Sequence, residues 1–159
     1  GNVMGSRGSV TTNFLKSKEN GYLEITDKKM TRFNITLAES IKMVEWTFKN
    51  SLGGEIFVPK IPSYKLIDLA KAICPKCRLK IKGIRPGEKL HEELISVGES
   101  MHTIKTKDYF VILPFEDKNY VLKYQKKLKG KRIKEGFSYK SNENSFLSIS
   151  ELKKLLASY

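Results

Sequence analysis

The chain has 159 residues, of which 40% are hydrophobic and 10% aromatic, and its formal net charge is +13. This length suits one domain around a single core, and the composition excludes a largely disordered chain. The sequence contains no apolar run long enough to cross a membrane and no signal peptide, so it predicts a cytoplasmic protein without membrane insertion. The positive charge favours anionic partners, but dispersed lysines are typical of a solvated surface, so we expect no nucleic-acid partner.

The first half of the chain predicts alternating strands and helices. Residues 1–13 have a Gly-, Ser- and Thr-rich loop composition, and residues 22–25 alternate as in a short strand. Thr36 and Glu39 have the spacing of a capping box, which predicts a helix that ends at the pair of glycines beginning with Gly53. We expect Trp46 on this helix to be a core residue.

A second strand and helix follow. Residues 55–58 predict a buried strand, and Ser63 is expected to cap the next helix. The apolar face of that helix consists of Leu66, Ile67, Leu69, Ala70 and Ile73. The order of elements predicts a small α/β fold.

The second half of the chain predicts shorter elements without a regular alternation of strands and helices. We expect a strand over residues 79–84, a short helix over 88–94 and one or two strands over 103–113. Residues 118–134 are strongly basic and are predicted to be poorly structured or to lie at an edge. Ser148 and Glu151 form a capping box for a last helix with the apolar stripe Leu152, Leu155 and Leu156.

The tetrapeptide Arg85-Pro86-Gly87-Glu88 combines a cation, a tight turn and a carboxylate. Pro86 fixes φ and Gly87 permits a positive φ, so the sequence predicts a type II turn. A guanidinium suits phosphate oxygens, and a carboxylate accepts hydrogen bonds from a diol. A nucleoside diphosphate presents both groups, although these four residues taken alone favour an exposed turn with an incidental ion pair.

Two cysteines and two histidines are spaced C-x2-C-x13-H-x10-H, from Cys74 to His102. The histidines are too far apart for a zinc finger. The cysteine pair follows the predicted end of a helix, whereas a thioredoxin-like redox motif opens one. We therefore predict two reduced thiols, no metal site and no redox chemistry.

Four ordered blocks carry a resemblance to a known family. They are GNVMGSRGSV at residues 1–10, ITDKKMTRF at 25–33, EIFVPKIPS at 55–63 and RPGEKLHEEL at 85–94. Together they resemble the C-terminal part of the inverting UDP-N-acetylglucosamine 4,6-dehydratases. These are polysaccharide-biosynthesis enzymes of the extended short-chain dehydrogenase/reductase superfamily. The resemblance runs from Gly1 to about Pro114 and continues more loosely to the end of the chain.

The resemblance implies an activity and a fold. Members of this family use NADP to oxidise C4 of the sugar, remove water across C5–C6 and return the hydride to C6, and the inverting members also epimerise C5. The product is a 4-keto-6-deoxy sugar nucleotide for flagellin glycans, capsule or O-antigen. The implied fold is the α/β substrate-binding portion of a Rossmann-type enzyme, and the family assembles as homo-oligomers.

The chain departs from the family pattern where catalysis is concerned. It has no G-x-x-G-x-x-G after an opening strand, and none of its tyrosines is followed four places later by a lysine. The resemblance therefore implies that the NADP-binding region and the catalytic residues belong to a missing N-terminal part. We expect no catalytic, cofactor-binding or metal-binding residue in this chain, and no activity from the chain alone.

The same resemblance assigns substrate contacts. Asn2 is expected to hydrogen-bond the diphosphate or sugar, and Ile25 and Thr26 to lie along the uracil. Arg32 and Arg85 are expected at the phosphates, with Glu88 at the ribose hydroxyls. Arg32 has an alternative role in an ion pair with Asp27, and Asn2 an alternative as a simple turn residue. His91 and Glu92 are expected on the surface of the short helix rather than in acid/base roles.

The sequence thus predicts a UDP-sugar-binding α/β region over residues 1–115 and a basic C-terminal extension over 116–159. UDP-N-acetylglucosamine is the expected ligand, within an NADP-dependent dehydratase. Two alternatives remain. One is a stand-alone basic module that binds polyanions, either nucleic acid or glycan, through residues 118–134. The other is a degenerate, non-catalytic paralogue.

Overall fold

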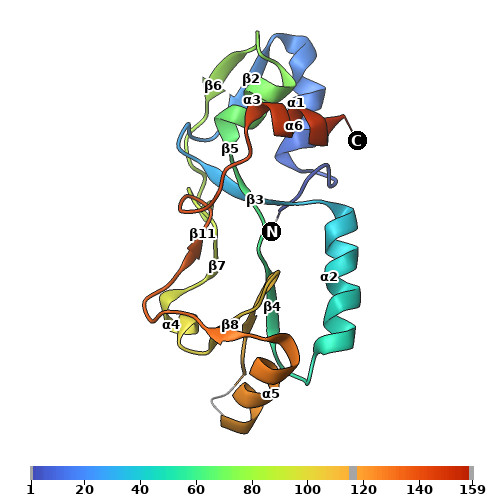
Figure 1. Ribbon diagram of the computed structural model, residues 1–159. Coiled ribbons are helices and arrows are strands. Elements are labelled where there is room, and N and C mark those ends of the chain that lie inside the picture. Colours follow the sequence, from blue (N-terminus) through green and yellow to red (C-terminus); the bar gives the residue numbers. More distant parts are fainter. Residues whose placement is uncertain (1, 115–117, 158–159) are drawn as a thin grey trace. The chain divides into compact units, whose positions relative to one another are not determined.

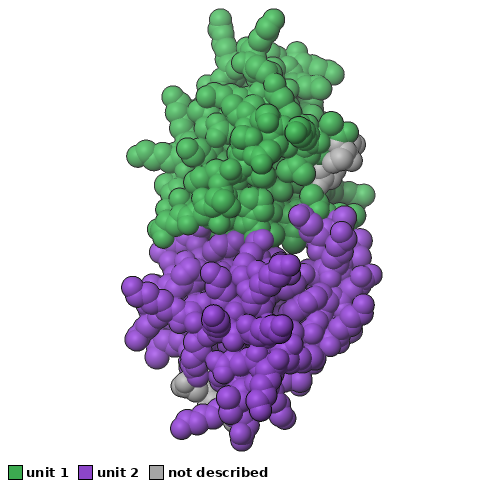
Figure 2. Space-filling model, in the orientation of Figure 1, with its two compact units in different colours: residues 1–37, 61–92, 141–159 green, residues 38–60, 93–140 purple. Residues whose placement is uncertain are grey.

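The computed structural model describes residues 2–114 and 118–157, and it divides the chain into two compact units (Figures 1 and 2). Unit 1 joins residues 1–37, 61–92 and 141–159, and unit 2 joins residues 38–60 and 93–140. Each unit is therefore assembled from segments that are far apart in the sequence. The boundary predicted between residues 115 and 116 lies outside the described residues and stays a prediction.

The strands of unit 1 form a three-stranded sheet and a two-stranded sheet. In the first, β3 (Thr31–Ile35) lies between β1 (Asn2–Val3), which is parallel to it, and β5 (Ser63–Lys65), which is antiparallel. The second pairs β2 (Tyr22–Ile25) in parallel with β6 (Arg78–Ile81). The strand predicted over residues 22–25 is confirmed. Every residue of β3 is buried, so this strand is the centre of the unit.

Three α-helices pack around these strands: α1 (Val10–Ser17), α3 (Leu66–Ile73) and α6 (Ile149–Leu156). A short 3-10 turn, η1 (Lys18–Asn20), follows α1. Helices α3 and α6 lie side by side in Figure 1, and Leu152 of α6 is fully buried in the core. The predicted capping box of α6 is confirmed, because the Ser148 and Glu151 side chains each accept a bond from the other residue's backbone N–H. The core also contains Met4, Phe14, Leu23, Ile25, Met30, Tyr64, Leu66, Leu69, Ala70 and Ala72.

Unit 2 is built on an antiparallel four-stranded sheet in the order β10-β8-β9-β4. These strands are β4 (Ile56–Pro59), β8 (Thr103–Lys105), β9 (Tyr109–Ile112) and β10 (Lys131–Arg132). A separate antiparallel pair joins β7 (Glu93–Ile95) to β11 (Tyr139–Lys140). The helices are α2 (Leu37–Asn50), α4 (Val97–Ser100) and α5 (Lys118–Leu128). A small core forms between the sheet and α5, made of Ile104, Val111, Leu113, Val121 and Tyr124.

A carboxylate holds α5 to the loop between α2 and β4. The Tyr120 hydroxyl donates to Glu55 Oε1 at 2.6 Å, and the Tyr124 hydroxyl donates to the same oxygen. The backbone N–H of Leu52 donates to this carboxylate at 2.7 Å. Burial alone would raise the pKa of Glu55, but hydrogen bonds from Tyr120 and Tyr124 lower that pKa to about 2. The ionised carboxylate is therefore the form that stabilises unit 2.

Helix α2 forms as predicted, but its apolar residues are not buried within the described residues. Trp46 is only half-buried and stacks on Tyr109 with ring centroids 4.2 Å apart, so its expected place in the core is met only in part. Phe48 is 85% exposed. The other exposed apolar residues of the helix are Leu37, Ile41 and Val44. These four share one helical stripe, because they are three or four residues apart.

Several local predictions are wrong. Ser63 does not cap α3, because it is buried in β5 and bonded to the backbone of Ser145 and Leu147; the N-cap of α3 is Lys65. The loop predicted over residues 1–13 ends earlier, since α1 begins at Val10. The predicted buried strand at 55–58 begins at Ile56, and of its residues only Val58 is buried. Of the basic segment, residues 118–128 form helix α5 instead of lacking structure, whereas residues 131–132 form β10 at the edge of the sheet, as the edge-lying alternative predicted.

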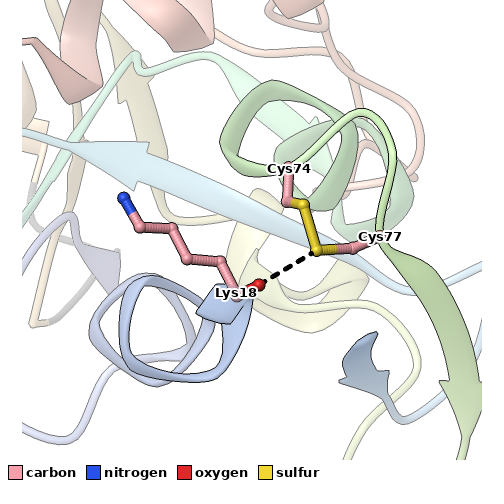
Figure 3. Close-up of a disulfide and its surroundings, with 3 residues drawn as sticks. All are labelled: Lys18, Cys74 and Cys77. Carbon is pink, nitrogen blue, oxygen red and sulfur yellow. Dashed lines mark hydrogen bonds between the residues drawn. A yellow bond between two sulfur atoms is a disulfide. The ribbon is translucent and has the colours of Figure 1, made fainter. Parts of the chain in front are cut away.

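Cys74 and Cys77 form a disulfide, which corrects the prediction of two reduced thiols (Figure 3). Cys74 follows the last residue of α3, and Cys77 precedes β6, so the bond joins the end of the helix to the start of the strand. The sulfur of Cys77 also lies 3.5 Å from the carbonyl oxygen of Lys18. Among the described residues there is no group of three His, Cys, Asp or Glu side chains placed to hold a metal ion, and no helix is long and apolar enough to span a membrane.

Removing the disulfide should destabilise unit 1 only moderately, because it closes a loop of four residues. A loop this short corresponds to about 2 kcal/mol of unfolding free energy. We expect the Cys74→Ser/Cys77→Ser variant to lose about this amount in urea denaturation. Dithiothreitol should destabilise the wild type equally and leave the variant unchanged. An equal response of both proteins to dithiothreitol would contradict the disulfide.

The carboxylate of Glu55 should make unit 2 sensitive to acid. Its pKa is about 2 in the folded chain, against 4.5 for an ordinary glutamate. A lowered pKa stabilises the fold above pH 4.5, and this contribution is lost as the pH falls towards 2. Glu55→Gln should therefore be less stable than the wild type at neutral pH. As the pH falls from 4.5 towards 2, the variant should also lose less unfolding free energy than the wild type does. Glu45→Gln, on the exposed face of α2, is the control and should match the wild type. Urea midpoints measured across this pH range test the difference.

Candidate functional site

The turn from Arg85 to Glu88 is ordered by its own hydrogen bonds. The Glu88 N–H donates to the Arg85 carbonyl at 3.0 Å, and Gly87 has a φ of 80°. The predicted turn with a positive φ at the glycine is thus confirmed. The Glu88 side chain folds back, with Oε2 accepting from the Arg85 N–H at 3.3 Å and Oε1 from the Thr26 hydroxyl at 3.2 Å. Glu88 therefore links the turn to the residue that follows β2.

A glycine-containing loop between β1 and α1 lies near this turn. Gly5 and Gly8 both have a φ of 75°, which glycine adopts without a steric penalty. The Ser9 side chain accepts from the Thr12 N–H and caps α1. The loop thus leads from β1 directly to the N-terminus of a helix, whose free N–H groups favour negative charge.

Two adjoining hollows in unit 1 are lined by these elements. The first has a volume of about 450 Å³ and the second about 360 Å³. Both include Gly8, Val10, Thr26 and Glu88 in their walls. The six residues predicted from the sequence all line one hollow or both. Ile25 and Arg85 line the first, Asn2 and Arg32 the second, and Thr26 and Glu88 both.

The two predicted arginines differ in what they already bind. Arg32 is 9% exposed, and its guanidinium donates to the Lys89 carbonyl at 2.9 Å and to the Leu90 carbonyl at 3.2 Å. Its Nε lies 3.3 Å from a carboxylate oxygen of Glu92, so the ion pair is not with Asp27. Arg85 is exposed, and no hydrogen bond or ion pair holds its guanidinium within the described part of the chain. Arg32 is thus committed to the fold, and Arg85 is available to an anion.

The segment after the turn is extended, so the helix predicted over residues 88–94 is wrong. The Thr31 N–H donates to the Leu90 carbonyl at 3.1 Å, in addition to the bonds from Arg32. His91 Nδ1 lies 2.8 Å from the Thr31 hydroxyl, which in turn contacts the Ser141 hydroxyl at 2.7 Å. These partners on β3 occupy the carbonyls that a helix would use internally. His91 and Glu92 therefore do not lie on the predicted helix surface. Their side chains bind Thr31 and Arg32 of β3 instead.

The electrostatics of the hollows suit binding rather than proton transfer. Tyr64 lines the second hollow, and burial raises its pKa to about 12 despite the opposing charge of Arg32. Its hydroxyl therefore stays protonated at neutral pH. The first hollow contains the cations Lys16, Lys82 and Arg85 against the carboxylates Glu24 and Glu88. Lys82 is paired with Glu24 at 2.6 Å. Guanidinium and carboxylate groups of this kind are able to bind anions and hydroxyl groups, respectively.

Sequence reasoning missed Arg7 and Tyr64 as wall residues. Arg7 is exposed in the loop between β1 and α1 and lines the second hollow. The signal that points to it is the serine cap at Ser9, which places Arg7 just before a helix N-terminus. Tyr64 has no comparable signal, because it reaches the hollow through its antiparallel pairing with Arg32.

Comparison with known proteins identifies the family of this chain. Residues 1–114 match the family model described as polysaccharide biosynthesis protein. The chain belongs to the polysaccharide biosynthesis protein family. Within the family, it is 47% identical over 150 residues to the inverting UDP-N-acetylglucosamine 4,6-dehydratase of Campylobacter jejuni, a match that covers 91% of this chain and 45% of the relative. The resemblance stated from the sequence blocks is thereby confirmed.

Other family relatives carry different names. A UDP-glucose 4-epimerase of Rickettsia conorii is 35% identical over 162 residues, covering 98% of this chain and 47% of the relative. The X-ray structure of Pen from Bacillus thuringiensis matches with a TM-score of 0.80 and 34% identity, over 99% of this chain and 48% of that chain. The fold is therefore that of the family, and the chain spans about half the length of the relatives it matches.

Arg32→Ala should unfold unit 1 more readily. The substitution removes the side-chain donor of the Lys89 carbonyl and the ion-pair partner of Glu92, which costs about 2–4 kcal/mol of unfolding free energy. Arg85→Ala, which removes an exposed guanidinium that no described residue binds, should change stability by less than about 0.5 kcal/mol. Urea denaturation of both variants tests the contrast. Equal losses in the two variants would show that Arg32 is not the structural arginine.

Proposed function

We propose that this family member is the sugar-nucleotide-binding portion of a UDP-N-acetylglucosamine 4,6-dehydratase. The observation that carries the proposal is the exposed Arg85 guanidinium beside Glu88, which has no partner among residues 2–114 and 118–157 and lies on a turn that borders both hollows. The inverting dehydratase of Campylobacter jejuni, at 47% identity, supports the dehydratase over the 35% identical epimerase. The ligand is then UDP-N-acetylglucosamine, and the parent enzyme makes a 4-keto-6-deoxy sugar nucleotide.

The wall residues take distinct roles in this proposal. Arg85 binds the diphosphate, with Arg7 as a second cation. Glu88 accepts from the ribose hydroxyls, because each of its oxygens makes a single hydrogen bond to the described residues and keeps lone pairs for a diol. Ile25 and Thr26 lie along the uracil, and Asn2 contacts the diphosphate or sugar. Arg32 contributes its charge from within the wall, since most of its N–H groups are occupied.

Catalysis and cofactor binding belong to another part of the parent enzyme in this proposal. The loop from Gly5 to Ser9 follows a strand and opens a helix, but its glycines lack the fingerprint spacing of a dinucleotide cradle. These residues do not fit NADP, and we assign no reaction step to them. The oxidation at C4, the loss of water and the epimerisation at C5 require NADP and acid/base groups from that other part, so the chain alone is inactive.

The exposed stripe on α2 is consistent with a larger protein. Phe48 is 85% exposed and Leu37 62%, and the chain covers 45% of its Campylobacter relative. Apolar stripes of this kind are normally covered by protein. We infer that the remaining part of the parent enzyme, or a second copy in a homo-oligomer, covers α2. We place the enzyme in the cytoplasm, supplying flagellin glycosylation or capsule synthesis.

Calorimetric titration of the chain with UDP-N-acetylglucosamine and with UDP tests the binding proposal. Both ligands should bind, and Arg85→Ala should weaken both by at least about tenfold. This follows because a charged hydrogen bond to phosphate contributes about 1.5–3 kcal/mol. Arg78→Ala is the matched control, since Arg78 is exposed at the start of β6 and lies outside both hollows. It should bind as the wild type does.

Two results would count against the proposal. Unchanged affinity in Arg85→Ala would remove Arg85 from the site. Equal affinity for UDP and for ADP would remove the uracil contacts assigned to Ile25 and Thr26. The circular dichroism spectrum of Arg85→Ala should match that of the wild type, so that a folding defect is excluded as the cause of a change in affinity.

A further inference from the structure

Unit 2 has a strongly basic surface that the sugar-nucleotide site does not use. Residues 118–134 contain seven lysines, one arginine and no acidic residue, which accounts for most of the net charge of +13. Acidic residues occur beside this range, at 116, 117 and 135. We call α5 together with residues 129–134 the basic surface.

Helix α5 separates its charged and apolar residues cleanly. Val121 and Tyr124 are buried in the core of unit 2. The opposite face has Lys118, Leu122 and Lys126 at intervals of four residues, and such residues are neighbours on a helix surface. Leu122 is 49% exposed between the two lysines. An apolar side chain therefore lies within a field of positive charge.

The rest of the basic surface extends this charge along the chain. Lys123, Lys127, Lys129, Lys131 and Lys134 are exposed. Lys127 also donates to the carbonyls of Lys49 and Asn50 at 3.2 and 3.3 Å, at the end of α2. Helix α5 is thus held at both its buried and its exposed sides. The surface is formed before any partner binds.

The aromatic residues of α5 are turned away from this surface. Tyr124 has no exposed area, and the Tyr120 and Tyr124 hydroxyls both donate to Glu55. Binding of single-stranded nucleic acid relies on exposed aromatic rings on which bases stack. The cations are nearly all lysines, which act as point charges and lack the planar fork of arginine. This arrangement favours a diffuse anionic surface over a nucleic acid.

We propose that the basic surface binds an anionic lipid membrane peripherally. The lysines lie among the anionic headgroups, and Leu122 enters the boundary between headgroups and acyl chains. Clusters of four to eight cations on an amphipathic helix have the charge that such a surface attracts. The proposal does not depend on the ligand of unit 1, because every residue it uses belongs to unit 2.

Vesicle co-sedimentation of the 159-residue chain tests this. The chain should bind vesicles that contain phosphatidylserine and should not bind vesicles of phosphatidylcholine alone. Lys118→Glu/Lys123→Glu/Lys126→Glu should lower the affinity by at least about tenfold. Raising the ionic strength from about 0.1 M to about 1 M should release the wild type, because the Debye length falls from about 10 Å to about 3 Å. The control variant is Lys71→Glu/Lys76→Glu/Lys153→Glu, which makes the same change in net charge on exposed residues of unit 1. It should bind the vesicles nearly as tightly as the wild type does.

The Leu122→Ser variant distinguishes binding to a lipid membrane from binding to other polyanions. It should weaken binding to the vesicles by about threefold or more and leave binding to heparin unchanged, because only the membrane takes up the apolar side chain. Circular dichroism spectra, together with a Lys→Gln version of the triple variant, control for folding. The proposal is overturned if the wild type does not bind anionic vesicles. It is equally overturned if the control triple variant in unit 1 loses as much affinity as the Lys→Glu triple variant of the basic surface. It is also overturned if single-stranded DNA binds more tightly than the vesicles through the same lysines.

Discussion

The buried guanidinium of Arg32 is the constraint on which the site in unit 1 depends. A charge that is 9% exposed requires partners, and it finds them in the carbonyls of Lys89 and Leu90 and in the Glu92 carboxylate. These bonds hold the segment after the turn against β3 in an extended form. The turn from Arg85 to Glu88 is thereby fixed at its downstream end, and the Thr26–Glu88 bond fixes it to β2. These two attachments fix the part of the walls that Thr26, Arg32 and Glu88 form.

The cations of unit 1 divide into those that build the site and those that remain available to a ligand. Arg32 and Lys82 are bonded to carboxylates or carbonyls, whereas Arg85 and Arg7 are exposed. A bonded, buried cation has a fixed position but few donors left, and an exposed one keeps its donors. An anion-binding site benefits from both kinds, because the first shapes the wall and the second makes the contacts. The family match over residues 1–114 includes all four of these residues.

Unit 2 differs from unit 1, because its side-chain hydrogen bonds to Glu55 lie beneath α5 and its exposed surface contains apolar and charged side chains. The Glu55 carboxylate draws the hydroxyls of Tyr120 and Tyr124 inwards and so fixes α5 on the sheet. This leaves the lysines and Leu122 on the outer face of α5. Helix α2 presents a separate apolar stripe that includes Phe48. These two surfaces, one apolar and one basic, thus have the chemistry of interfaces, and none of their residues lines the hollows of unit 1.

The sequence by itself determined the features that depend on a few adjacent residues. The turn at Gly87, the capping box of Ser148 and Glu151 and the strand from Tyr22 to Ile25 are set by local φ preferences, side-chain caps and alternation. The family was also readable, because four blocks kept their residues and order. Arg85 and Glu88 were candidates from the chemistry of their turn as well as from that resemblance, the other four candidates came from the resemblance, and all six line the two adjoining hollows.

Only the tertiary structure decided the features that depend on distant partners. The segment from Lys89 to Glu92 has helical composition, yet Arg32 and Thr31 take its carbonyls, and backbone groups bonded to another strand cannot also bond within a helix. Ser63 has the chemistry of a cap, yet Ser145 and Leu147 pair with it in β5. Arg32 is bonded within the fold and Arg85 is exposed to solvent. This difference likewise arises from burial, and the sequence does not show which of the two arginines is buried. Local patterns state what a segment prefers, and the partners that folding brings to it decide what it becomes.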